Sequence, residues 1–433
     1  MSHAFIGLLA ISLLLLLIFL RVPIAIALVL IGFVGNVSFQ GLDPTLVQFQ
    51  LLIWEVANSF LLIALPLFIW MGQLASAGQL GQDLYRGFQT WTGQVRGGLA
   101  VSSILSSASF GAITGSSMAT VMAMGQMMMP EMKRYHYAPS LAAGSVASAG
   151  VLAIMIPPSI PLVFYSAWTE TSLGDLFMAA IFPGLLLTLL FAAYVLIRCK
   201  LNPTLAPKGT PSTLKEKIHA IRYLLPILSI LIGILGCMYS GVATPTEAAA
   251  LGVCGVLIAA LIKGKLSLKA FKESLSQSAL LSANIFTLLL GGMFFSRFLA
   301  QTEITQILID QIATLQVSRY WIITALVLMY LLLGAILDTF GMIILTLPFA
   351  FPLILAQGFD PVWFGIFIVL MIELSLITPP VGIHVFLLKR INPEISLTEI
   401  FYGTLPFVAL TLFMVALLIA FPSLALWLPA QMK

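Results

Sequence analysis

Two double prolines interrupt long apolar stretches of the sequence. Pro157-Pro158 lies in IMIPPSI, where Pro161 follows closely, and Pro379-Pro380 lies in LITPPVG. Because proline lacks a backbone N–H, a helix that runs through either pair must open and leave carbonyl oxygens without their usual donors. Such carbonyl oxygens are suitable ligands for a small cation such as Na⁺.

Two other apolar stretches contain a short run of small and hydroxyl-bearing residues. The first is SFGAITGSSMAT, residues 109–120, and the second is LGAILDTFG, residues 333–341. In the second run, Asp338 and Thr339 occupy the places that Gly115 and Ser116 have in the first. Close helix packing alone can explain the small residues. A carboxylate inside a membrane is costly, however, and Asp338 is therefore a candidate functional group.

The composition excludes a water-soluble globule. The chain has 433 residues, of which 60% are apolar and 8% charged, and its mean hydropathy is +1.09. Since a bilayer crossing needs about 20 apolar residues, the chain can supply about a dozen membrane segments. The three cysteines form no CxxC pair, so neither a disulfide framework nor a thiolate metal site is expected.

Positive charges gather in short polar gaps, which we expect to face the cytoplasm. These residues are Arg86, Arg96, Lys133, Arg134, Arg198, Lys200, Lys208, Lys215, Lys217, Arg222, Lys263, Lys265, Lys269, Lys272, Lys389 and Arg390. The gaps 38–45, 168–175 and 301–318 are poor in positive charge and should face outward. The apolar start of the chain is interpreted as a retained first span rather than a cleaved signal peptide, because its charge lies at the wrong end. Both termini are then expected on the outer side.

The chain carries an internal repeat with an offset of 222 to 224 residues. Five features recur in order: Pro23 and Pro245, Gly111 and Gly334, the two double prolines, SLGDLF and SLTEIF, and Pro183 and Pro406. The repeats are predicted to be residues 1–210 and 223–433, joined by a cytoplasmic linker at 211–222. Because the gap after the first double proline is acidic and its counterpart carries Lys389 and Arg390, the two repeats should have inverted topology.

This topology predicts an all-α polytopic membrane protein in which each repeat contains a re-entrant hairpin and a broken helix. The hairpins are expected near 98–129 and 319–355, and the broken helices near 139–166 and 361–388. Continuous helices are expected near 4–20, 23–37, 48–75, 172–197, 223–240, 245–262, 278–300 and 399–428. Non-helical backbone at membrane depth must be buried or line a wet cavity, so we expect the hairpin tips and the breaks to meet.

We predict that these tips and breaks form one midplane site, where helix N-termini attract an anion and opened carbonyls bind Na⁺. The candidate substrate-binding residues are Ser116, Ser117, Thr120, Ser159, Thr339 and His384. The candidate Na⁺ ligands are Ser109, Gly115, Ala153, Ile156 and Ser159 at a first site, and Gly334, Asp338, Ser375, Thr378 and Val381 at a second. For His384, a structural role as a hydrogen-bonded polar residue is an open alternative. Glu373 is a weaker functional candidate.

The sequence closely resembles the large membrane subunit of tripartite ATP-independent periplasmic (TRAP) transporters. The resemblance spans nearly the whole chain and includes SFLLIALPLFIWMG (59–72), VRGGLAV (95–101), ITGSSMATV (113–121), IPPS (156–159), ATPTEAAALG (243–252), LGAILD (333–338), GFDPVWFG (358–365) and ITPPVG (377–382). It implies a Na⁺-coupled importer of an organic acid anion in a bacterial or archaeal inner membrane, which works as an elevator. The implied partners are a small four-helix membrane subunit and a periplasmic substrate-binding protein.

An intramembrane protease and a stand-alone symporter are the two other classes of function for a chain of this kind. An intramembrane protease would need an HExxH, GxGD or GxSG motif, and none occurs, so we expect no enzymatic activity. ATP is not expected as an energy source, because the sequence has no Walker A run, and no nucleic-acid partner is expected. A stand-alone Na⁺/carboxylate symporter of the same architecture remains an alternative. The substrate is open among C4-dicarboxylates, sialic acid, 2-oxo acids and sulfonates.

Overall fold

The computed structural model describes residues 3–209, 211–315 and 317–431, and the regular elements of these residues are all helices. The first half contains α1 (His3–Phe19), α2 (Ile24–Gln40), α3 (Leu42–Ala57), η1 (Leu61–Ile63), α4 (Ala64–Ala77), α5 (Leu80–Thr92), α6 (Gly98–Thr114), α7 (Ser117–Arg134), α8 (Pro139–Met155), α9 (Ile160–Thr169) and α10 (Leu173–Leu201). The second half contains α11 (Leu214–Tyr239), α12 (Pro245–Ile262), α13 (Leu268–Gln301), α14 (Ile304–Thr314), α15 (Arg319–Leu333), α16 (Thr339–Ala356), α17 (Pro361–Ile377), α18 (Ile383–Ile391), α19 (Leu397–Ala420) and α20 (Ser423–Ala430).

The helices have the length and composition of membrane spans. In the described part of the chain, six are long and apolar enough to cross a bilayer alone, and two bent pairs raise that number to eight. The all-α, polytopic membrane fold that the composition predicts is therefore confirmed. Each segment expected to be interrupted contains two helices: α6 and α7, α8 and α9, α15 and α16, and α17 and α18.

Two expected helices are divided, and these two predictions were wrong. The segment 48–75 consists of α3 and α4, which meet at an angle of 62°. Asn58 ends α3, where its side-chain amide donates to the carbonyl of Trp54 at 2.9 Å. Pro66 lies in the first turn of α4, where its missing N–H costs no hydrogen bond. The segment 399–428 is likewise divided into α19 and α20 by Phe421 and Pro422, since Pro422 cannot donate within a helix.

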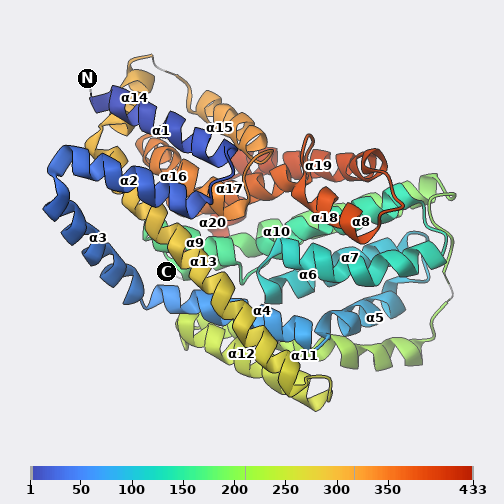
Figure 1. Ribbon diagram of the computed structural model, residues 1–433. Helices are drawn as coiled ribbons and strands as arrows, with labels where there is room; N and C mark the ends of the chain where they lie inside the picture. The colour runs from blue at the N-terminus through green and yellow to red at the C-terminus, as the bar shows by residue number, and fades with distance from the viewer. Residues whose placement is uncertain (1–2, 210, 316, 432–433) are drawn as a thin grey trace.

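Helices α1 to α4 and α11 to α13 pack together, and we call them the peripheral group. Figure 1 shows α13 as a long helix that runs along α2 and α4. The helices α2 and α13 lie close because Gly32 faces the backbone of Phe295, 3.0 Å from where a Cβ of Gly32 would be. The buried Asn36 accepts a hydrogen bond from the side chain of Gln301 at 2.8 Å. Small residues and a buried amide therefore hold this pair, as in other membrane helix contacts.

The interrupted helices form a second unit together with α10, α19 and α20, which we call the hairpin group. Within it, α8 contacts α6, α7, α17 and α19. Helices α8 and α19 cross at Gly144 and Gly403, so closely that a Cβ at Gly144 would overlap the carbonyl of Gly403. The two groups touch directly where α4 contacts α6 and α13 contacts α16. Two further helices bridge them: α5 contacts α11 and α6, and α14 contacts α1 and α16.

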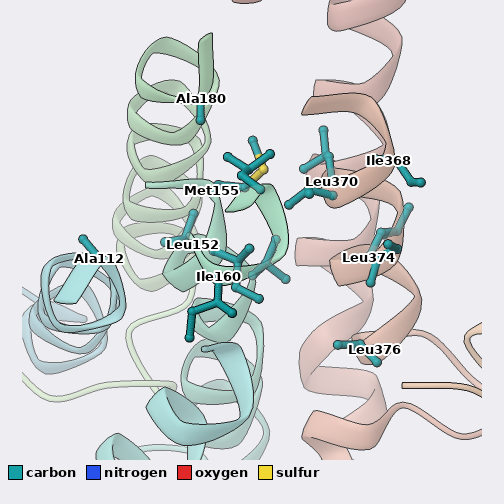
Figure 2. Packing of buried hydrophobic residues seen from close by; sticks show 14 of the residues in the cluster. Ala112, Leu152, Met155, Ile160, Ala180, Ile368, Leu370, Leu374 and Leu376 are labelled. Carbon is teal, nitrogen blue, oxygen red and sulfur yellow. The ribbon is translucent and has the colours of Figure 1, made fainter. Parts of the chain in front are cut away.

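The two broken helices face each other across a buried apolar layer. Figure 2 shows Leu152 and Met155 of α8 on one side of this layer and Leu370 and Leu374 of α17 on the other. All four side chains are buried. Because apolar packing of this kind is dense and non-directional, it holds the two breaks in place without competing for their free polar groups.

Gly144→Ala should destabilise the fold by about 1–3 kcal/mol, because the added methyl group overlaps backbone that cannot move aside. The measurement is thermal unfolding in detergent. Gly233→Ala in α11 is the matched control, since no atom lies within 4 Å of its Cβ position. Equal melting temperatures for the two variants would contradict the close α8–α19 crossing.

Candidate functional site

The tip of the first hairpin rests on the first helix break. The tip turns at Gly115, whose φ of +59° lies in the left-handed region that glycine adopts without strain. The carbonyl of Gly115 accepts a hydrogen bond from the backbone N–H of Ile160, at 3.4 Å. Just before the tip, Gly111 contacts Ala153 so closely that a Cβ at Gly111 would overlap it. The tip of α6 and α7 is therefore fixed to the break between α8 and α9.

The first break leaves backbone oxygens without their helical donors. Pro157 has no N–H to donate to the carbonyl of Ala153, and Ile160 donates to Gly115 rather than to Ile156. The hydroxyl of Ser159 is fully buried and has no hydrogen-bond partner among the described residues. The hydroxyl of Ser109 donates a hydrogen bond to the carbonyl of Leu105 at 3.0 Å, and the lone pairs of its oxygen remain available. The break thus offers several oxygen atoms with free lone pairs, which can bind a cation.

The second tip and break are arranged in a similar way. A Cβ at Gly334 would overlap the side chain of Ser375, so the end of α15 lies directly against α17. The hydroxyl of Ser375 donates to the carbonyl of Ile372 at 2.6 Å, and that of Thr378 donates to Leu374 at 2.6 Å. Past the double proline, Val385 donates to Gly382 at 2.8 Å instead of to Val381. Gly334, Ser375, Thr378 and Val381 therefore belong to one region of the molecule.

Asp338 caps the helix that follows the second tip. Its carboxylate accepts a hydrogen bond from the backbone N–H of Gly341 at 3.0 Å, at the start of α16. A carboxylate at this place is favoured by the partial positive charge of a helix N-terminus. This contact occupies part of the lone-pair capacity of one carboxylate oxygen.

A cavity of about 110 Å³ lies between the two tips. Of the six predicted substrate-binding residues, Ser116, Ser117 and Thr339 line it. The other three do not: Thr120 shares a hydrogen bond with Thr114 at 2.9 Å, and Ser159 and His384 are fully buried. The structure therefore brings together one residue from the second tip and two from the first, while the remaining three lie outside the cavity lining.

Three helix N-termini meet at this cavity. Its lining includes the first residues of α7, α9 and α16, at Ser117, Ile160 and Thr339. No lysine or arginine is among the lining residues. The start of α7 can present backbone N–H groups and partial positive charge to an anion. At α9 the N–H of Ile160 donates to Gly115 and Pro161 has none, and at α16 the carboxylate of Asp338 already caps the N-terminus.

Polar residues of α4 line the cavity, and the sequence analysis did not identify them. Gln73 and Ser76 share one face of α4 with Ile69 and Gly72, all of which line the cavity. The backbone of the first tip packs against the same face of α4, because a Cβ at Gly72 would lie only 2.7 Å from the Cα of Thr114. Two polar residues on one helical face within an apolar span are a signal that could have identified them. The cavity therefore lies between the hairpin group and the peripheral group.

A buried carboxyl group joins the two halves of the chain. Glu373 of α17 is fully buried, and its Oε1 accepts a hydrogen bond from the hydroxyl of Ser117 at 3.1 Å. Its Oε2 lies 4.0 Å from Nε2 of His384, which is also fully buried. Glu373, the weaker candidate from the sequence, is thus in direct contact with the first tip.

One known family matches nearly the whole chain. The family model described as "Tripartite ATP-independent periplasmic transporter, DctM component" matches residues 11–424. The chain belongs to this family. As a DctM-family protein with several apolar spans, it is a multi-pass inner-membrane permease subunit.

Named relatives of this DctM-family chain are similar along most of their length. It is 32% identical over 403 residues to the C4-dicarboxylate TRAP transporter large permease protein DctM of Pseudomonas aeruginosa. The aligned region covers 92% of this chain and 93% of the relative. It is 32% identical over 410 residues to the ectoine TRAP transporter large permease protein TeaC of Halomonas elongata, with 94% of each covered. The sialic acid TRAP transporter large permease protein SiaM of Vibrio cholerae is 28% identical over 376 residues, with 86% and 87% covered. All three relatives are named as large permease proteins of TRAP transporters.

A solved structure shares the fold. The YdaH transporter of Alcanivorax borkumensis, described as having an unusual topology, superposes with a TM-score of 0.58 at 14% sequence identity. The superposition covers 89% of each chain. At this identity the similarity concerns the fold alone.

Ser117→Ala should destabilise the protein by about 1–3 kcal/mol, because it leaves a buried carboxyl oxygen of Glu373 without its donor. Thermal unfolding of Ser117→Ala, Glu373→Met and the double variant forms a double-mutant cycle, because methionine has a similar length and no carboxyl oxygen to accept the bond. We expect an interaction energy of about 0.5–3 kcal/mol between the two sites. Ser229→Ala, at an exposed position of α11, is the control. Additive effects of the two substitutions would contradict the contact.

Proposed function

We propose that the protein imports an organic acid anion in symport with Na⁺. The observation that carries this proposal is a cavity that is lined by Ser116, Thr339 and the start of α7 and has no cationic side chain in its lining. Such a site suits a carboxylate, which accepts hydrogen bonds from N–H and O–H groups. The relatives named for C4-dicarboxylate and sialic acid transport support the same class of substrate.

Two Na⁺ sites are part of the proposal. The carbonyl oxygens of Ala153 and Ile156 and the unpartnered hydroxyl of Ser159 support the first. The approach of Gly334 to Ser375 and the free carbonyl of Val381 support the second. Opened backbone beside a substrate cavity is where coupling ions bind in transporters of this construction. A bound Na⁺ would lower the cost of an anion in the adjacent cavity, because the two charges attract.

We further propose that the two halves are inverted repeats and that transport follows an elevator mechanism. The repeat offset in the sequence and the same order of hairpin and broken helix in each half support the inverted repeats. The grouping of the helices into a peripheral group and a hairpin group, with the cavity at the boundary between them, supports motion of one group against the other. In that motion the tips and breaks would travel together, so the site need not be rebuilt on the other side of the membrane.

The proposed partners are a small membrane subunit and a periplasmic binding protein that delivers the anion. The family description and the names of the relatives support a multi-subunit assembly. With the positive clusters in the cytoplasm, both termini would lie on the periplasmic side.

Uptake by reconstituted vesicles tests this function. We expect accumulation of the anion only with an inward Na⁺ gradient, the binding protein and the small subunit, and without ATP. Full uptake in K⁺ without a Na⁺ gradient would contradict the coupling. Uptake of free substrate by the large subunit alone would favour the stand-alone symporter.

The dependence of uptake on Na⁺ concentration is then measured for the original protein and for Asp338→Asn. We expect the variant to need a higher Na⁺ concentration, because a carboxylate beside the second site is lost. Asp310→Asn, at an exposed position of α14, is the control. An unchanged Na⁺ response in Asp338→Asn would mean that Asp338 only caps α16.

A further inference from the structure

A groove of about 610 Å³ lies at one end of the peripheral group, between α5, α11 and the end of α12. It is distinct from the cavity between the hairpin tips, and it shares no residue with that cavity. Figure 1 shows α5 beside α11 at this end of the molecule. We propose that this groove binds the headgroup of an anionic phospholipid.

The groove has an excess of positive charge. Four cations line it, Arg86, Arg222, Lys263 and Lys265, against the single carboxylate of Asp83. That carboxylate already forms an ion pair with Lys263. Among the described residues, no carboxylate lies within ion-pairing distance of the other three cations. The groove is therefore complementary to an anion that comes from outside the chain.

Two of these cations are held in place by neutral partners. The guanidinium of Arg222 donates to the phenol oxygen of Tyr223 at 2.7 Å and lies 4.7 Å from the centre of its ring. The ammonium of Lys265 donates to the side-chain carbonyl of Gln79 at 3.0 Å. Neither contact neutralises the charge. Partly ordered cations of this kind lose less conformational freedom when a phosphate binds.

The part of the groove formed by α12 before its cations is apolar and exposed. Ile258 and Ile262, on the last turns of α12, are 57% and 82% exposed, and both line the groove. Lys263 and Lys265 follow directly after this apolar face. Cations at the end of a membrane helix lie at headgroup level, and the apolar residues before them lie at the level of the acyl chains. A molecule with a phosphate next to an acyl chain fits both parts, whereas a soluble phosphate fits only one.

Such a lipid would connect a bridging helix to the peripheral group. Arg86 lies on α5, which leads from α4 to the first hairpin, whereas Arg222 lies on α11. Gly87 of α5 already packs against Leu224 of α11, where a Cβ would lie 2.5 Å from the leucine side chain. A phosphate shared by Arg86 and Arg222 would strengthen this contact. The proposal concerns lipid binding alone and does not depend on Na⁺ coupling or on the substrate.

Binding of dioleoylphosphatidylglycerol to the full-length chain in detergent tests the proposal, with dioleoylphosphatidylcholine as the neutral lipid. Native mass spectrometry gives the affinity for each lipid. The test variant is Arg86→Gln with Arg222→Gln, and the matched control is Arg198→Gln with Lys200→Gln, two exposed cations at the end of α10. At about 1 kcal/mol for each lost contact, the test variant should bind phosphatidylglycerol about thirtyfold more weakly. The control should bind it as the original protein does.

Three results would overturn the proposal. The first is equal loss of phosphatidylglycerol binding in the test and control variants, which would indicate general surface charge. The second is full competition by soluble glycerol 3-phosphate, which would indicate a site for a free phosphate. The third is an unchanged phosphatidylglycerol affinity of the test variant. If that variant also lost the small membrane subunit on purification, the groove would be assigned to that subunit. Unfolding temperatures in phosphatidylcholine verify that both variants fold.

Discussion

The architecture depends on one constraint: backbone polar groups at membrane depth need partners, because hydrocarbon supplies none. Each double proline removes donors from a helix, and each break is covered by a hairpin tip from the same half of the chain. The contacts between Gly115 and Ile160 and between Gly334 and Ser375 have this role. The carbonyls that remain unpaired near the tips are the groups that the proposed Na⁺ would use.

Contacts between the halves bring the first hairpin together with the second tip and the second broken helix. The hydrogen bond from Ser117 to Glu373 joins the first hairpin to the second broken helix, and the cavity takes its lining from both tips. Close helix crossings, such as Gly144 over Gly403, give this unit a rigid frame. The wall formed by Gln73 and Ser76 belongs to the peripheral group instead. A displacement of one group against the other would therefore change access to the cavity without separating the tips.

The sequence predicts the breaks and tips well, because missing N–H groups and hydroxyl residues in apolar surroundings have local causes. It predicts poorly what depends on distant packing. Ser117 and Glu373 are 256 positions apart, and nothing local indicates that they meet. The face of α4 that carries Gln73 is directed to the cavity only by tertiary contacts. The division at 48–75 was also missed, because nothing in the apolar pattern around Asn58 marks the end of α3.

The central claim is that the hairpin group moves as one body relative to the peripheral group. Spin-label distances test it most directly, with labels at the exposed positions Arg134 of α7, Lys200 of α10 and Lys215 of α11, after replacement of Cys237 and Cys254. Between Na⁺-free vesicles and vesicles with Na⁺ and the transported anion, the distance from Arg134 to Lys200 should stay constant, and that from Arg134 to Lys215 should change. A constant distance from Arg134 to Lys215 in protein that still transports would contradict the account.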